Sequence, residues 1–462
     1  MQKKTNHYLD KAMIGVILAL AWPTMLEQLL HTAVLYIDTA MIGTLGTEAT
    51  AAVGSTTTVN WLINSSISAL SIGFLAFIAK ACGAKDEKSA RRASAQALLT
   101  VLVVGTFFTV LTASLSGMVP IWMQVDKDIQ KMASMYFLII YLPMLPRTAS
   151  IIFGTVLRAA GDTKTPMKVG VVVNFVNVIL NFFLIYEVRN VVIFGISVKI
   201  FGAGLGVVGA AVASAIAFLV GGICITIVLW KHPVVSPKGE KLTPDKNILK
   251  PCLKIALPNM LQRFGTSLGY VAFASMINSL GEIATAAHTI ANTVESAFYI
   301  PAYGMQTAAS TLTGNAYGAN DNERMKRLTN MFLPIEIFLM TITGGLLFVT
   351  APALMGLFST SAAVIAQGAT VLRMVAVSEP FYGVSIIVEG FMLGVGRTKR
   401  PFVYNIIGMW GIRIVGTYIC TQILHMGLAS AWACMIAHNL LLFVCFLTTF
   451  LRKSWNPMEK AI

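Results

Sequence analysis

Apolar runs of about 20 residues recur along the whole chain, and this pattern constrains the fold most strongly. About 20 residues is the length that an α-helix needs to cross the hydrocarbon core of a bilayer. Only 12% of the 462 residues are charged, whereas soluble domains average about 25%. The pattern therefore predicts an all-α polytopic membrane protein. It excludes secreted disulfide scaffolds, disordered chains and soluble nucleic-acid-binding domains, although the net charge of +14 is strongly basic.

Charged residues and Gly or Pro breaks divide these runs into twelve predicted transmembrane helices. The connections between them are short, so we expect no soluble catalytic domain. The predicted spans lie near residues 13–40, 50–79, 94–122, 131–155, 166–187, 204–230, 248–277, 285–314, 328–355, 362–392, 401–423 and 428–451.

Lys and Arg are distributed unequally between the two sets of connections. Most of them lie in the even-to-odd connections and at the two termini, whereas the odd-to-even connections hold only Lys127, Lys131, Arg189 and Lys199. Loops rich in Lys and Arg face the cytoplasm in multi-pass proteins. The sequence therefore predicts a protein of the inner or plasma membrane with both termini in the cytoplasm.

The two halves of the chain repeat each other at a constant offset of 235 residues. When residues 21–92 are laid over residues 256–327 without a gap, 19 of 72 positions are identical. The same offset superposes two later loops, Gly161-x-Thr163-Lys164-x-Pro166 and Gly396-x-Thr398-Lys399-x-Pro401. One register that holds across separate loops indicates a true internal duplication.

The duplication predicts two six-helix lobes with parallel topology, at residues 1–235 and 248–462, joined by a cytoplasmic linker at residues 236–247. Parallel repeats of this kind are a transporter architecture, in which the substrate path lies between the repeats. The alternative is that a duplicated helix bundle of any function would give the same pattern.

Polar residues form stripes along several predicted helices. A charge at the bilayer centre costs at least a few kcal/mol, so each is a candidate functional residue. An α-helix turns by about 100° per residue, which places the residues of each stripe on one face. Helix 1 carries Glu27, His31 and Asp38; helix 5 carries Asn174, Asn177 and Asn181; helix 8 carries His288, Asn292, Glu295 and Tyr299.

The predicted helix 10 carries Glu379 and Glu389, with Pro380 next to the first of them. Acids that bind and release a cation or proton suit an ion-coupled carrier, but Asn, His and paired charges also join helices structurally. Glu27 and Glu336 lie nearer the predicted helix ends, where they could be solvated. Three arginines could pair with the glutamates or contact substrate: Arg263, Arg373 and Arg413.

Several segments together resemble the multidrug and toxic compound extrusion (MATE) family of transporters. The string Leu157-Arg158-Ala159-Ala160-Gly161-Asp162-Thr163-Lys164-Thr165-Pro166 is similar to that family's loop after helix 4. The first-helix region of the family resembles Pro23, Asp38-x-x-x-x-Gly43-x-Leu45-Gly46 and Ala51-Ala52-x-Gly54. Its entry into helix 6 is similar to Gly206-x-x-Gly209-Ala210-Ala211-x-Ala213, and its helix 8 pattern to Ala287-His288, Glu295, Pro301, Gly304 and Gly314.

The resemblance implies two six-helix lobes around a central cavity and export of organic cations in exchange for Na⁺ or H⁺. It implies a cation site in the first lobe, in which Asp38 is the acid, Asn177 and Asn181 are the amide pair, and Ser214 is the hydroxyl. Na⁺ would be held by Asp38, Asn177 and Asn181. Some members carry an acid in helix 7, where this chain has Arg263 and Thr266. A second-lobe site would therefore have to be built differently, from Glu295, Glu379 and Glu389.

Three other functions remain as alternatives. A major-facilitator carrier also has six plus six helices, and a lipid-linked oligosaccharide flippase of the same superfamily generally has fourteen. A membrane-embedded enzyme would need a metal-spaced cluster or an activated nucleophile, and the sequence contains no G-x-x-x-x-G-K-[ST] string for ATP. We expect no enzyme activity, no cofactor apart from the coupling ion, contacts with membrane lipid but not with nucleic acid, and function as a monomer.

The predicted topology can be tested by labelling single cysteines with an impermeant reagent on intact cells, in a variant without the native cysteines. The basic even-to-odd loops should be protected because they face the cytoplasm, whereas a cysteine at Lys127 should react. The protected positions are Lys85, Lys164, Lys241, Arg327 and Lys399. Labelling at positions 164 and 399 would contradict the topology.

Overall fold

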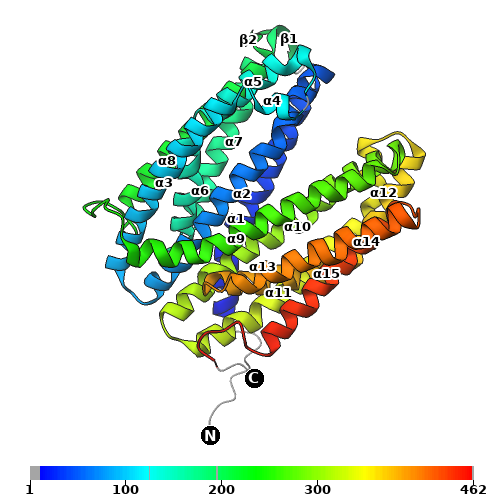
Figure 1. Ribbon diagram of the computed structural model, residues 1–462. Helices are drawn as coiled ribbons and strands as arrows, with labels where there is room; N and C mark the ends of the chain where they lie inside the picture. The colour runs from blue at the N-terminus through cyan, green and yellow to red at the C-terminus, as the bar shows by residue number, and fades with distance from the viewer. Residues whose placement is uncertain (1–10, 124, 194–195, 460–462) are drawn as a thin grey trace. The chain divides into compact units, whose positions relative to one another are not determined.

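The computed structural model describes residues 11–123, 125–193 and 196–459, and twelve helical segments follow the predicted spans in order (Figure 1). The terminal residues 1–10 and 460–462, whose location is part of the topology prediction, lie outside the described residues. Ten segments are single helices: α1 (Lys11–Gly43), α2 (Thr47–Gly83), α3 (Glu87–Leu115), α7 (Lys164–Leu184), α8 (Gly206–Lys231), α9 (Lys246–Asn278), α10 (Glu282–Gly318), α11 (Asn322–Phe358), α12 (Ala362–Gly394) and α15 (Leu428–Leu451).

The helices are long enough to extend beyond a bilayer core. α2, α10 and α11 have 37 residues each, or about 55 Å at 1.5 Å per residue. Among the described residues, nine helical segments are long and apolar enough to cross a membrane, and ten if a bent pair counts as one. α9 and α10 do not reach that hydropathy, since polar residues interrupt both. The chain is therefore a multi-pass membrane protein.

The predicted third and fourth spans differ from the structure. The third, at 94–122, is α3 followed by the short α4 (Val119–Trp122). The fourth, at 131–155, is two helices, α5 (Lys127–Tyr141) and α6 (Met144–Ala159), which meet at an angle of 49°. Pro143 lies in the break, and proline has no N–H with which to continue the helical hydrogen-bond ladder. The fourth predicted span is thus a bent pair of helices, and the bend was not predicted.

The predicted eleventh span, at 401–423, is continuous but changes its helical pitch. It consists of α13 (Lys399–Ile406), a π-helix η1 (Ile407–Ile414), α14 (Val415–Tyr418) and a second π-helix η2 (Ile419–Ile423). π-turns are rare and occur frequently at functional sites. Arg413 lies within η1. Hydrophobic periodicity did not predict this feature.

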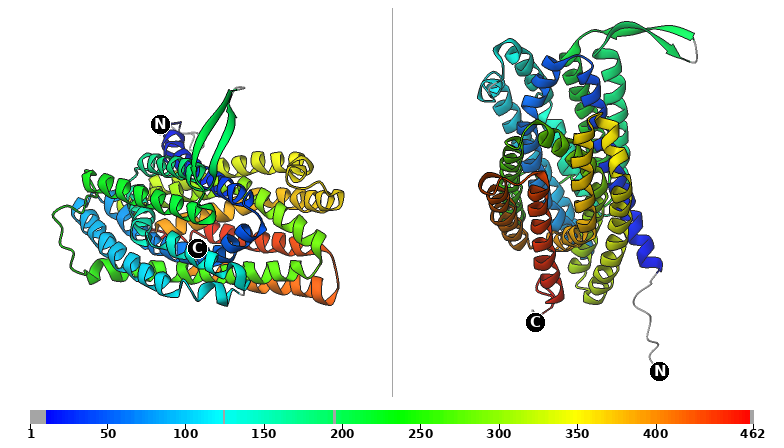
Figure 2. Two further views of the ribbon diagram at one scale, coloured as in Figure 1. Left: turned by 90° about the horizontal axis from the view of Figure 1, so that it is seen from above. Right: turned by 90° about the vertical axis from the view of Figure 1, so that its right-hand side faces the viewer.

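An antiparallel hairpin connects α7 to α8. Its strands are β1 (Glu187–Ile193) and β2 (Ile196–Ala203), with Arg189 paired to Ile200. The hairpin extends beyond the ends of the two helices that it joins (Figure 2). The guanidinium of Arg189 stacks on the ring of Tyr186, 4.0 Å from its centroid. This basic residue, one of the few in the odd-to-even connections, is thus held at the base of the hairpin.

The described residues form two compact units that do not follow chain order strictly. The amino-terminal unit comprises Leu29–Phe74 and Glu87–Leu249, and the carboxy-terminal unit comprises Met1–Gln28, Leu75–Asp86 and Lys250–Ile462. The predicted lobes at 1–235 and 248–462 differ from these units, because α1 and α2 each contribute residues to both. The predicted linker belongs to the amino-terminal unit, where the Gln96 side chain bonds the backbone of Thr243 and Asp245.

The ends of α2 and α10 meet in a reciprocal contact within the carboxy-terminal unit. A Cβ atom added at Gly83 would overlap the carbonyl oxygen of Asn315, and one added at Gly318 would overlap that of Lys80. Gly83 and Gly318 are related by the 235-residue offset, as are Lys80 and Asn315. Only glycine at both positions lets the two backbones approach this closely. The internal duplication is thus visible as a pseudo-symmetric helix contact.

We expect Gly318→Ala to lower the stability of the protein by about 1–3 kcal/mol, the usual cost of overpacking a close contact. Gly345→Ala in α11 is the matched control, because nothing lies within 4 Å of the Cβ that it adds. Thermal unfolding in detergent should show a lower midpoint for the first variant and an unchanged or higher midpoint for the second. Equal unfolding midpoints for the two variants would mean that the contact between α2 and α10 at Gly318 is not tight.

Candidate functional site

Four residues predicted from the sequence form one hydrogen-bonded chain in the amino-terminal unit. The side-chain amide nitrogen of Asn181 donates to the Asp38 carboxylate at 2.6 Å and to Asn177 Oδ1 at 3.1 Å. The amide nitrogen of Asn177 donates to the hydroxyl of Ser214 at 3.0 Å. Asn177, Asn181 and Ser214 are buried and Asp38 is half-buried. The chain links α1, α7 and α8.

The local sequence explains why these side chains meet. Asn177 and Asn181 are four residues apart in α7 and therefore share one face of the helix. α8 lies unusually close to α7, because a Cβ at Gly209 would overlap the carbonyl oxygen of Leu184. Small residues of this kind let membrane helices approach each other. Ser214 thus comes within hydrogen-bond distance of Asn177.

The Asn181 amide does not point its oxygen at Asp38, as it would if both groups held one Na⁺ ion. The nitrogen of Asn181 faces the carboxylate, and Asn181 Oδ1 is buried without a hydrogen-bond partner among the described residues. A carboxylate can only accept hydrogen bonds, so in this state it selects the donor end of the amide. Asn181 Oδ1 can therefore bind a cation, and it would face Asp38 if the amide group turned over.

Sequence reasoning missed a buried arginine in the same unit. Arg147 in α6 donates to Asn60 Oδ1 of α2 at 2.7 Å, and its guanidinium lies 4.5 Å from the ring centroid of Phe218. Arg147 is a single charge inside an apolar run, and this signal was available in the sequence. It supplies a fixed positive charge to the amino-terminal unit.

Three glutamates are buried in the carboxy-terminal unit: Glu295 on α10, Glu336 on α11 and Glu379 on α12. Glu336 is 0% exposed, so the expectation that it could be solvated was wrong, because α11 begins earlier than predicted and places it about four turns deep. Both carboxylate oxygens of Glu336 and of Glu379 lack hydrogen-bond partners among the described residues. Glu295 and Glu379 lie near enough for their negative charges to repel each other when both are ionised.

The predicted stripe on helix 8 has a mixed environment. Asn292 is exposed, whereas His288 and Tyr299 are half-buried. The ring of His288 lies between Phe273 and Trp432, at centroid distances of 5.6 and 5.8 Å. Tyr299 packs edge-on against Tyr303 and Tyr382. His288 therefore packs among aromatic rings. Within this stripe, Glu295 is buried and Asn292 is exposed.

The remaining candidates have separate partners. Glu389 accepts a hydrogen bond from Gln262 at 2.8 Å, a pairing that the sequence did not predict. Glu27 is half-buried in α1 and belongs to the carboxy-terminal unit, unlike Asp38. Among the predicted arginines, Arg413 is buried and interacts electrostatically with Glu295. Arg263 bonds Asn259, and Arg373 bonds the carbonyl oxygen of Phe348.

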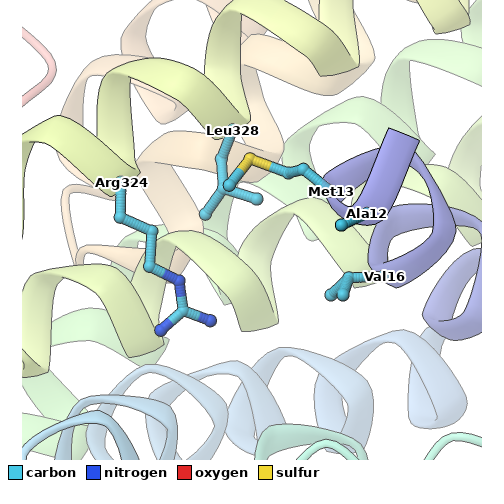
Figure 3. Close-up of a pocket in the computed structure, with 5 residues that line it drawn as sticks. All are labelled: Ala12, Met13, Val16, Arg324 and Leu328. Carbon is cyan, nitrogen blue, oxygen red and sulfur yellow. The ribbon is translucent and has the colours of Figure 1, made fainter. Parts of the chain in front are cut away.

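Two cavities in the carboxy-terminal unit are lined by residues outside the predicted site. One, of 180 Å³, lies between the starts of α1 and α11, where the Met13 side chain extends toward Leu328 (Figure 3). The other, of 510 Å³, is lined by α9 and by the residues around the start of α13.

The sequence model of the MatE family matches residues 23–183 and 258–419 of this chain, which is more than half of its length. The two matched stretches are one in each half of the internal duplication. This match decides against the major-facilitator and membrane-enzyme alternatives.

Known proteins and structures agree with the match. The Thermotoga maritima "Probable multidrug resistance protein NorM" is 26% identical over 98% of this chain and 96% of its own length. The mouse "Multidrug and toxin extrusion protein 1" is 23% identical over 72% of this chain and 56% of its own. A structure described as "Outward-facing conformation of a multidrug resistance MATE family transporter of the MOP superfamily" has a TM-score of 0.87 at 23% identity, over 95% of both chains. The chain therefore belongs to the multidrug and toxic compound extrusion family, whose members are transporters and not enzymes.

Proposed function

We propose that this transporter is a secondary active antiporter of the inner or plasma membrane, with both termini in the cytoplasm. It exports organic cations and other drugs in exchange for Na⁺ or H⁺, and it functions as a monomer without a further cofactor. The observation that carries this proposal is the chain from Asp38 through Asn181 and Asn177 to Ser214. The names of the bacterial and mouse relatives, which refer to multidrug resistance and toxin extrusion, support the substrate class.

Asp38 is the coupling acid in this mechanism. Its carboxylate is half-buried in a membrane helix, where a negative charge is costly unless it is compensated. A proton compensates the charge directly. Na⁺ compensates it through oxygen ligands, which hard cations prefer: the Asp38 carboxylate, the amide oxygens of Asn177 and Asn181, and the Ser214 hydroxyl. Asn181 Oδ1, buried without a partner among the described residues, is the oxygen most free to join such a set.

Neutralising Asp38 weakens the bond that ties α1 to α7. The interior Pro23 of α1 removes one hydrogen bond from the helical ladder and makes bending at that point less costly. The hydroxyl of Thr24 next to it lies 2.8 Å from the carbonyl oxygens of both Ala21 and Gly304, and either of them can accept its single hydrogen. An ion can shift a conformational equilibrium only through its different affinity for the two states. We infer that the charged and neutral forms of Asp38 favour different bends of α1.

Asp38→Asn should abolish gradient-driven efflux, because an amide neither binds a proton nor supplies the charge that holds Na⁺. Expression and drug binding should remain largely intact. The measurement is ethidium efflux from reconstituted vesicles, with a Na⁺ gradient and a pH gradient imposed separately. The wild-type protein in the same assay identifies the coupling ion.

Asp126→Asn is the matched control for this experiment, since Asp126 is exposed at the start of α5. It should pump at the wild-type rate. If Asp38→Asn still pumps under both gradients, Asp38 is not the coupling acid, and the glutamates of the carboxy-terminal unit take its place.

Glu295 is the proposed counter-charge for a cationic substrate. Glu295→Gln should weaken the binding of cationic drugs roughly tenfold, from the loss of a charged interaction worth about 1.5 kcal/mol, and should leave neutral drugs nearly unaffected. Dye-displacement binding to the purified protein measures both classes. Glu282→Gln, an exposed position in the first turn of α10, is the control. An equal loss for both classes would indicate a structural role, with Arg413 as the partner.

A further inference from the structure

A basic cavity of 510 Å³ lies in the carboxy-terminal unit, beside the loop between α12 and α13. Its described lining contains four basic residues and no acidic residue. The loop and α9 contribute three lining residues each, and the first turn of α13 contributes two. The lining residues are Pro251, Lys254, Ile255, Gly396, Arg397, Thr398, Lys399 and Arg400.

The arginines of this cavity bond only neutral groups in the described part of the chain. Arg397 donates to the carbonyl oxygen of Ser454. Arg400 donates to the same oxygen at 3.1 Å and to the Ser454 hydroxyl at 2.6 Å. Burial, and then repulsion by Arg400, lower the pKa of Arg397. Two guanidinium groups therefore converge on one carbonyl oxygen without an anion between them.

The internal duplication shows which charged group the second loop lacks. In the first half, the Asp162 carboxylate accepts a hydrogen bond from the backbone N–H of Thr165 at 3.0 Å, in the first turn of α7. In the second half, Arg397 stands at the position of Asp162 and Arg400 at that of Thr165. The two loops share their backbone form, because Gly161 and Gly396 have φ angles of +91° and +77°. At these two positions, the loop thus carries one anion in the first half and two cations in the second.

The first turn of α13 consequently has no anionic cap among the described residues. The Thr398 hydroxyl donates to the carbonyl oxygen of Ile255 at 2.8 Å and makes no cap hydrogen bond. The backbone N–H groups of a first helical turn have no partners within the helix, and together with the helix dipole they attract anions. A phosphate group at this position would bond these N–H groups and the forked guanidinium groups at once.

We propose that the cavity binds a phosphate group, and that an anionic phospholipid of the membrane supplies it. α13 begins a helical segment long and apolar enough to cross a membrane, so its first turn lies at the depth of lipid headgroups. Basic pockets between membrane helices are recognition sites for such headgroups. The topology predicted from the basic loops places this pocket at the cytoplasmic leaflet.

The experiment compares lipid retention in the full-length protein and two charge-matched variants. Arg397→Asp with Arg400→Thr gives the second loop the residues of the first. Lys164→Glu with Lys168→Gln removes the same amount of charge from exposed positions at the corresponding end of α7. Each protein is reconstituted in nanodiscs of phosphatidylcholine with a minority of phosphatidylglycerol, and native mass spectrometry counts the phosphatidylglycerol that remains bound.

The wild-type protein and the lysine variant should retain phosphatidylglycerol, and the arginine variant should retain it about thirtyfold less, as expected for the loss of two basic contacts worth about 1 kcal/mol each. Arg400→Thr alone, at an exposed position, should show an intermediate loss even if the double variant folds poorly. Equal retention in the wild type and both arginine variants would overturn the proposal.

A second arm distinguishes the source of the phosphate. Inorganic phosphate is titrated onto the protein in pure phosphatidylcholine nanodiscs, and thermal unfolding is recorded. We expect little stabilisation of the wild type by inorganic phosphate and a clear one by phosphatidylglycerol. Stabilisation by inorganic phosphate alone, lost in the arginine variant, would keep the phosphate site but overturn the lipid as its ligand.

Discussion

The absence of water inside the bilayer is the constraint on which the rest of this structure depends. A backbone N–H or C=O group in hydrocarbon must find its partner within the protein, and a helix satisfies these groups within one segment. The same constraint acts on side chains, since each polar group within the membrane needs a protein partner or carries a cost. The positions of polar residues within the membrane-spanning helices therefore indicate candidate binding sites for ions or substrates.

The two units meet this constraint in different ways. In the amino-terminal unit, Asp38 is compensated by a relay of amides that ends at Ser214. In the carboxy-terminal unit, Glu336 and Glu379 are fully buried without hydrogen-bond partners among the described residues. A relay that satisfies a carboxylate can be switched when that carboxylate is neutralised. Glu336 and Glu379 have no such relay among the described residues, and this difference supports the proposal that Asp38 is the coupling acid.

The duplication preserved the backbone and diverged in charge. Gly83 and Gly318 still make matching close contacts, and Gly161 and Gly396 still adopt the same unusual φ. Phe273 occupies the position that corresponds to Asp38, and Arg397 the position that corresponds to Asp162. Backbone contacts tolerate few side chains, whereas charged positions at a helix end or in a site can change one at a time. The two halves of the duplication therefore keep similar backbone contacts while their charged residues differ.

The sequence alone predicted the twelve spans, the duplication and the polar stripes that carry Asp38, Asn177 and Asn181, because bilayer thickness and helical periodicity act over short stretches of chain. The resemblance to the MATE family added Ser214 and the grouping of these residues in one site. The tertiary structure decided the rest: the bend at Pro143, the burial of Glu336, the orientation of the Asn181 amide and the pairing of Gln262 with Glu389. It also placed Arg397 and Arg400 against Ser454, more than fifty residues away along the chain. These features depend on which helices become neighbours, and local hydrophobicity carries no information about partners that are distant in the sequence.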